Sequence, residues 1–122
     1  MADITTVEGL RVLFDPAAIS ALAASGGGAV IYGLAPEALT VGESTDALLR
    51  RLSLAASFAK LTRPDGTPIL INGKAVSVVR EPSPLEYAAA VHSVMFAGAL
   101  KQAVRETLDE VKAAINRAGG SL

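Results

Sequence analysis

Residues 61–82 read LTRPDGTPILINGKAVSVVREP, and residues 5–20 read TTVEGLRVLFDPAAIS. In both stretches a glycine precedes an apolar run, and Gly9 matches Gly66 at an offset of 57 residues (66 − 9). Self-similarity at a fixed offset is the sequence signature of a repeat. We therefore interpret the chain as a tandem duplication. Further identities at this offset are Leu13 with Leu70, Ala18 with Ala75, and Ser20 with Ser77.

The halves also agree near their ends, where the offset has grown to 63 residues (106 − 43). The difference is absorbed by the longer second-half loop REPSPLEYAAAVH, residues 80–92. One loop insertion between otherwise matching segments is what a duplication leaves behind. The matching positions are Val41, Glu43, Ser44, Asp46, Leu48 and Leu52 in the first half, and Val104, Glu106, Thr107, Asp109, Val111 and Ile115 in the second.

The second half predicts strands followed by a helix. The turn at PDG needs Gly66 at a positive φ, and β-branched residues favour strands on both sides of it. Thr107 caps a helix, with Glu110 three residues on completing a capping box. Gly119 and Gly120 end that helix. The expected strands are residues 58–62, 68–71, 75–79, 92–98 and 100–106.

The first half mirrors this pattern, with Ser44 as the helix cap and Leu48, Leu49 and Leu52 as its buried stripe. Its residues 16–36 carry no charge and are long enough for a membrane span. Glycines at its centre would weaken a helix, so we expect no membrane span but a hairpin of residues 18–22 and 29–34.

These patterns predict an α+β fold. Two pseudo-repeated antiparallel β units, residues 1–57 and 58–122, each end in a helix and pack as one β-rich domain. The linking segment SLAASFAK contains no proline, glycine or run of charges, so it does not look like a flexible linker.

The composition favours self-association. Of the 122 residues, 51% are hydrophobic and 4% aromatic, and the mean hydropathy of +0.43 is high for a small monomer. Extra apolar surface usually enters a subunit interface, which predicts a homo-oligomer. The net charge of −1 makes nucleic-acid binding unlikely. The absence of cysteine excludes disulfides and thiolate chemistry.

The sequence contains no catalytic or metal-binding constellation, and we expect neither an enzyme nor a cofactor. The only histidine, His92, has no identifiable partner. The SGGGAV turn lacks the Lys-Ser/Thr ending of a phosphate loop. Arginine binds carboxylate or phosphate bidentately, so a small anionic ligand is the remaining possibility. Its candidate binding residues are Arg63, Arg80, Lys101 and Arg105.

The second half resembles the small flagellar FlbD (SwrD-like) proteins, which read LTR-x-x-G, a strand ending in Asn, V-x-E-x-P and a V-R-E-S/T-x-x-E-V helix start. The resemblance implies a β-rich fold without catalysis and an accessory flagellar role. The first half keeps the glycine, the strand pattern and V-G-E-S, with Gly42 in place of the arginine. The matching positions are Thr62, Arg63, Gly66, Asn72, Pro82, Val104, Arg105, Glu106, Thr107 and Glu110.

Three functions follow as hypotheses. The first is a non-catalytic assembly or adaptor protein of flagellar or phage type, which binds itself and another protein. The second is sequestration or sensing of a small anionic ligand, such as a signalling nucleotide, by the arginines together with Tyr87 or Phe96. The third is single-stranded nucleic-acid binding. MADITTVEG at the N-terminus has no signal-peptide pattern, so we expect a cytoplasmic or virion-associated protein.

Overall fold

In a computed structural model that describes residues 2–122, the chain is an α+β, β-rich single domain. Over these residues it forms ten strands in three antiparallel sheets and two α-helices. The first half contains β1 (Ala2–Thr5), β2 (Arg11–Phe14), β3 (Ala21–Ser25), β4 (Gly28–Tyr32), β5 (Leu39–Val41) and α1 (Thr45–Arg51). The second contains β6 (Phe58–Thr62), β7 (Pro68–Asn72), β8 (Val76–Arg80), β9 (Ser93–Ala97), β10 (Leu100–Val104) and α2 (Leu108–Arg117).

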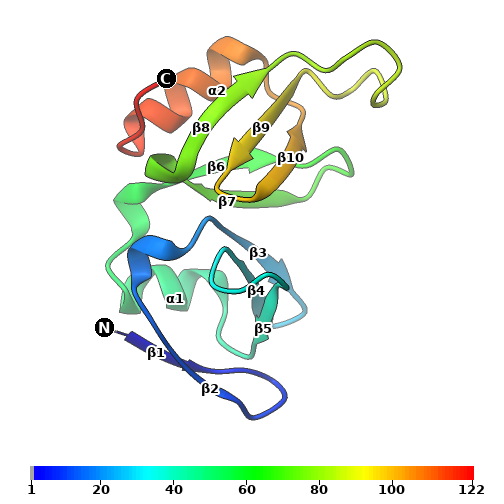
Figure 1. Cartoon of the computed structure of the whole chain (residues 1–122). Helices are drawn as coiled ribbons and strands as arrows, with labels where there is room; N and C mark the ends of the chain where they lie inside the picture. The colour runs from blue at the N-terminus through cyan, green and yellow to red at the C-terminus, as the bar shows by residue number, and fades with distance from the viewer. Residues whose placement is uncertain (1) are drawn as a thin grey trace.

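Both halves follow the same order of elements. Each begins with a hairpin, passes through a short 3₁₀ helix, continues into three strands and ends in an α-helix (Figure 1). The 3₁₀ helices are η1 (Pro16–Ala18) and η3 (Gly73–Ala75), and a third, η2 (Ala55–Ser57), joins the halves. The joining segment is therefore structured.

The largest sheet draws its strands from both halves. Its order is β5-β4-β3-β7-β6, so that β3 of the first half pairs with β7 of the second. In this pairing Ala21 lies opposite Ile71 and Leu22 opposite Leu70. The other sheets are β1-β2 and β10-β9-β8.

Two apolar clusters fill the interior, one in each lobe of Figure 1. The second-half cluster includes Met95 and Ile115 but also Ala21 from β3. The first-half cluster includes Leu22, which extends from the other face of the same strand. The β3 strand thus contributes to both cores, and this joins the halves into one domain.

The local turn and cap predictions are confirmed. Gly66 has φ +90°, in the left-handed region that glycine adopts without a Cβ penalty. Thr107 and Glu110 form both bonds of the capping box. After α2, Gly119 has φ +91° and the N–H of Gly120 donates to the carbonyl of Ile115 at 2.9 Å, which is a Schellman ending.

The expected strand at residues 18–22 is wrong at its start, because Ala18 belongs to η1 and β3 begins at Ala21. The Asp15 carboxylate accepts the N–H of Ala17 at 3.0 Å, and Pro16 supplies a fixed φ for the first helical position. The glycine hairpin itself is confirmed, with β3 ending at Ser25 and β4 beginning at Gly28.

The strand boundaries of the second half differ slightly from the expected ones. Ala75 lies in η3, so β8 runs Val76–Arg80 instead of 75–79. The capping geometry is the same as in the first half, since the Asn72 side chain accepts the N–H of Lys74 at 3.1 Å. Over residues 2–122, neither α-helix has the length and hydropathy needed to cross a bilayer.

Candidate functional site

Glu86, in the β8–β9 loop at residues 81–92, gathers two of the four candidate cations. Arg80 Nη1 and Nη2 each donate to one of its carboxylate oxygens at 2.9 Å, and Lys101 Nζ donates at 3.0 Å. The backbone N–H of Ser83 adds a fourth bond at 2.9 Å. The bidentate Arg80 contact, then the Ser83 and Lys101 bonds, hold the pKa of Glu86 well below its usual range. We call Arg80, Ser83, Glu86 and Lys101 the Glu86 clamp.

Two aromatic rings flank the clamp. The Arg80 guanidinium carbon lies 5.8 Å from the centroid of Phe96, and Lys101 Nζ lies 5.9 Å from that of Tyr87. Such distances are within cation–π range. The structure thus brings Arg80 and Lys101 together beside the aromatic residues expected near a ligand. The carboxylate that they bind belongs to the chain itself, and the clamp ties the middle of the loop to β8 and β10.

The other two candidate cations lie at the β6–β7 turn. Arg105 Nε and Nη2 donate to the carbonyl oxygen of Pro64 at 3.1 and 2.8 Å. Arg63 Nε donates to Thr67 Oγ1 at 2.8 Å. Both side chains tie down the turn. Arg105 and Lys101, expected to form one anion site, therefore have separate partners, on the turn and in the clamp.

Glu106 binds Thr62 and not its sequence neighbour Arg105. Its carboxylate accepts from the N–H of Thr62 at 2.9 Å and from Thr62 Oγ1 at 2.8 Å, joining the start of α2 to the end of β6. The first-half counterpart Glu43 instead binds Arg51 through two bonds of 2.9 Å. Equivalent carboxylates thus bind different partners in the two halves.

His92 is placed by hydrogen bonds along β10. Its Nδ1 lies 2.8 Å from the carbonyl oxygen of Arg105, and its backbone N–H donates to Val104 at 3.1 Å. His92 is solvent-exposed. Among residues 2–122, no group of three or more potential ligands could hold a metal ion.

Large apolar side chains are exposed on the β1–β2 hairpin, on β8 and in the β8–β9 loop. On the β1–β2 hairpin, Val7, Leu10 and Leu13 are 65%, 59% and 62% exposed. Val78 on β8 is 48% exposed, and Leu85, which has φ +65°, extends fully into solvent from the clamped loop. Sequence reasoning named none of these residues as a site. The available signal was the match of Leu13 with Leu70 in the repeat. Leu70 is partly buried, whereas its match Leu13 is exposed.

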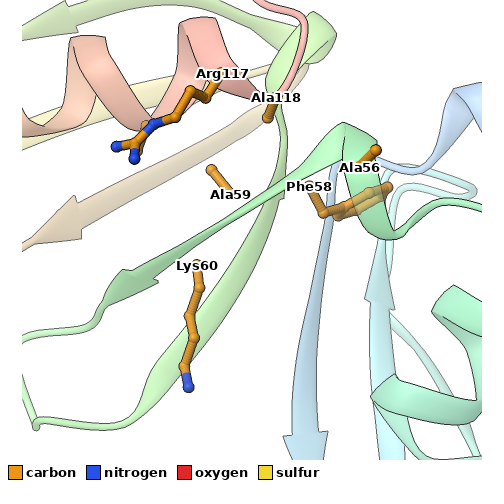
Figure 2. A pocket seen from close by; sticks show the side chains of 7 residues that line it. Ala56, Phe58, Ala59, Lys60, Arg117 and Ala118 are labelled. Carbon is orange, nitrogen blue, oxygen red and sulfur yellow. The ribbon is translucent and has the colours of Figure 1, made fainter.

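Two hollows border α2. One of about 290 Å³ lies between α2 and β6 and is lined mainly by alanines and Phe58; Figure 2 shows Lys60 and Arg117 extending from it in different directions. The other, of about 390 Å³, lies between α2 and β8. We call it the β8 groove, and its lining residues are Ser77, Val78, Val79, Leu108, Asp109, Lys112 and Leu122.

The chain matches no protein-family model, no curated protein and no solved structure. The resemblance of the second half to flagellar FlbD proteins therefore stays a prediction.

Proposed function

We propose that this protein is a non-catalytic assembly protein that binds copies of itself and a protein partner. The observation that carries the proposal is the exposure of Leu13 on β2 and Val78 on β8, two strands that lie at sheet edges. Large apolar side chains in water gain free energy when an interface covers them. The high mean hydropathy of +0.43 supports the same function.

The clamped loop supports a role in binding a protein partner. Glu86 ties the middle of the loop to β8 and β10 through Arg80 and Lys101, while the adjacent Leu85 extends fully into solvent. A non-glycine residue at a positive φ is held there by its surroundings at a free-energy cost, and such residues concentrate at functional positions. We propose that this rigidly presented leucine is a contact for the partner.

We further propose that the chain arose by tandem duplication, with units 1–57 and 58–122. The shared order of elements supports this proposal. So do the turn glycines Gly9 and Gly66, whose φ values are +92° and +90°. The side chains that cap η1 and η3, Asp15 and Asn72, also correspond at the 57-residue offset. A duplicated unit contains each edge strand twice, and two copies of a pairing edge are useful in a protein that assembles.

The anion hypothesis receives less support. Arg80 and Lys101 are both bonded to Glu86, and Arg105 is bonded to the Pro64 carbonyl. A ligand at either place would have to displace a bond within the chain.

The assembly function is tested by multi-angle light scattering of the purified chain at micromolar concentration, together with native mass spectrometry of protein isolated from cell extract. We expect a dimer or larger species, with or without a bound protein partner. A monomer without any partner would contradict the proposed function. A retained small anion in the native mass spectrum would support the ligand hypothesis instead.

A further inference from the structure

Among the sheet pairings, one strand pair joins the two halves, β3 with β7, in which Leu22 lies opposite Leu70. We propose that separate chains assemble head to tail by repeating this contact, with β8 of one copy pairing with β2 of the next. The inference rests on the assembly function proposed above. It specifies the partner as a second copy of this chain, and it specifies the two strands and their register.

Two short backbone links connect the three sheets into one series of neighbouring strands, with β2 at one end and β8 at the other. An isolated bridge between Thr6 and Val41 links the β1 and β5 ends in the first half. In the second, the N–H of Arg105 donates to the carbonyl of Thr62 at 2.9 Å, next to the ends of β10 and β6. Within residues 2–122, β2 pairs only with β1 and β8 only with β9. Each therefore leaves an edge able to pair with another chain.

These free edges cannot pair within one molecule, because β2 and β8 lie at opposite ends of the structure (Figure 1). In the repeat correspondence, β8 is the equivalent of β3 and β2 is the equivalent of β7. The two free edges, on β8 and β2, therefore correspond to the two strands, β3 and β7, that pair with each other at the junction between the halves.

The correspondence also predicts the register. Leu13 of one chain should lie opposite Val79 of another, and Phe14 opposite Val78, as Leu70 lies opposite Leu22 and Ile71 opposite Ala21. All four equivalences use the same offset of 57 residues: Leu13 with Leu70 (70 − 13), Phe14 with Ile71 (71 − 14), Ala21 with Val78 (78 − 21) and Leu22 with Val79 (79 − 22).

Exposure agrees with this register. Leu13 is 62% exposed, whereas its counterpart Leu70 packs against the first-half core. Val78 is 48% exposed, whereas its counterpart Ala21 is fully buried in the second-half core. Leu13 and Val78 are thus apolar and exposed, while the corresponding residues in the other half are packed at the junction. Pairing of β2 with β8 would remove both side chains from water.

The β8 groove provides the space for β2. Val79 and Leu108 line this groove of about 390 Å³. Their first-half counterparts, Leu22 and Thr45, line a cavity of only about 130 Å³, because Leu70 of β7 forms its opposite wall. The groove beside β3 is thus largely filled by a strand from the other half, and the equivalent groove beside β8 is open.

The expected ladder is short. Ala23, which continues β3 and is buried in the second-half core, corresponds to Arg80, which is bound by Glu86. Arg80 therefore limits the pairing to the region around Val78 and Val79. Because the two edges differ, the contact is heterologous and generates a closed ring or an open filament, not a two-fold dimer.

Cysteine cross-linking tests the register directly, since the chain contains no cysteine. Leu13→Cys and Val79→Cys proteins are purified separately, mixed at a concentration where the wild type is oligomeric, and oxidised. Directly opposite residues of antiparallel strands have Cβ atoms about 4.5–5.5 Å apart, close to the separation that a disulfide spans. We expect a disulfide-linked dimer from the mixture and none above background from either variant alone. A chain carrying both cysteines should give a ladder of multimers or one closed species.

Ser77→Cys mixed with Leu13→Cys is the register control, because Ser77 lies two residues before Val79 along β8, at the irregularity between Val76 and Val78. We expect several-fold less linkage there. Equal linkage in this control, or linkage of Leu13→Cys with itself, would overturn the proposed pairing. An oligomer in which Leu13 and Val79 do not link rejects this interface but leaves the assembly function standing. A monomeric wild type rejects this interface, and a monomer that also retains no protein partner contradicts the assembly function as well.

A second measurement does not depend on cross-linking. Val78→Lys places a charge on the free edge and should convert the oligomer to monomer, with an unchanged circular dichroism spectrum. Ala89→Lys adds the same charge at an exposed position of the β8–β9 loop, away from both edges, and should leave the oligomer intact. A folded Val78→Lys oligomer of wild-type size would refute the inference; if the variant is unfolded, the cross-linking result decides.

Discussion

Removing the Glu106 carboxylate should destabilise the protein more than removing its first-half counterpart, Glu43. Glu106 accepts two bonds from half-buried Thr62, at 2.9 Å from the backbone N–H and 2.8 Å from the hydroxyl. Glu43 bonds to the solvent-exposed Arg51 at 2.9 Å. The two glutamates occupy equivalent positions before a helix cap, so each serves as the matched control for the other.

The magnitudes follow from burial. Hydrogen bonds to a charged group contribute about 1.5–3 kcal/mol each, but Thr62 is only half-buried and water partly replaces the lost acceptor. We therefore expect Glu106→Ala to lower the free energy of unfolding by about 2 kcal/mol. Exposed ion pairs contribute about 0.2–1 kcal/mol, so Glu43→Ala should cost less than about 1 kcal/mol.

Urea unfolding followed by circular dichroism measures both variants at one protein concentration, which matters because assembly also stabilises the folded state. The midpoint should fall in Glu106→Ala with no change in the slope of the transition. Thr62→Val removes one of the two donors, and a double-mutant cycle with Glu106→Ala should give a coupling energy of at least about 0.5 kcal/mol. Equal losses for Glu106→Ala and Glu43→Ala, or no coupling to Thr62, would refute the reasoning.

Three further substitutions test the local structure. Gly66→Val should cost about 1 kcal/mol or more in urea unfolding, because φ at this position is +90°; a neutral result would contradict the left-handed turn. Glu86→Gln should flatten the pH dependence of stability: the depressed pKa of Glu86 stabilises the folded state above the usual carboxyl range, and this contribution is lost as the pH falls below about 4. Thermal melts at pH 6 and pH 3 measure it, and equal pH dependence in both proteins would argue against the clamp. Arg105→Ala should change stability by no more than about 0.5 kcal/mol, as expected for an exposed side chain, and calorimetry with phosphate and nucleotides should give no heat that depends on Arg105. Binding that Arg105→Ala abolishes would establish an anion site.

The local structure was determined by the sequence, because each signal depends on residues only a few positions apart. Gly66 adopts its turn conformation through its own missing Cβ. Thr107 and Glu110 cap α2 from positions three residues apart. The β-rich class also followed from such signals. The start of β3 was misplaced although Asp15 and Pro16 carried the information, since an Asp-Pro pair favours a turn.

Only the tertiary structure decided how the halves join and which partners the charged residues take. Pairing of β3 with β7 brings Leu22 to Leu70 across 48 positions (70 − 22), and local propensity does not encode contacts of that range. The four candidate cations were recognisable as residue types, but their acceptors were not. Arg105 bonds to the carbonyl of Pro64, 41 residues away, and Lys101 bonds to Glu86 in a loop whose course no local pattern determined. The free edges of β2 and β8 also required the tertiary structure, because a strand is an edge only if no other strand pairs with one of its sides.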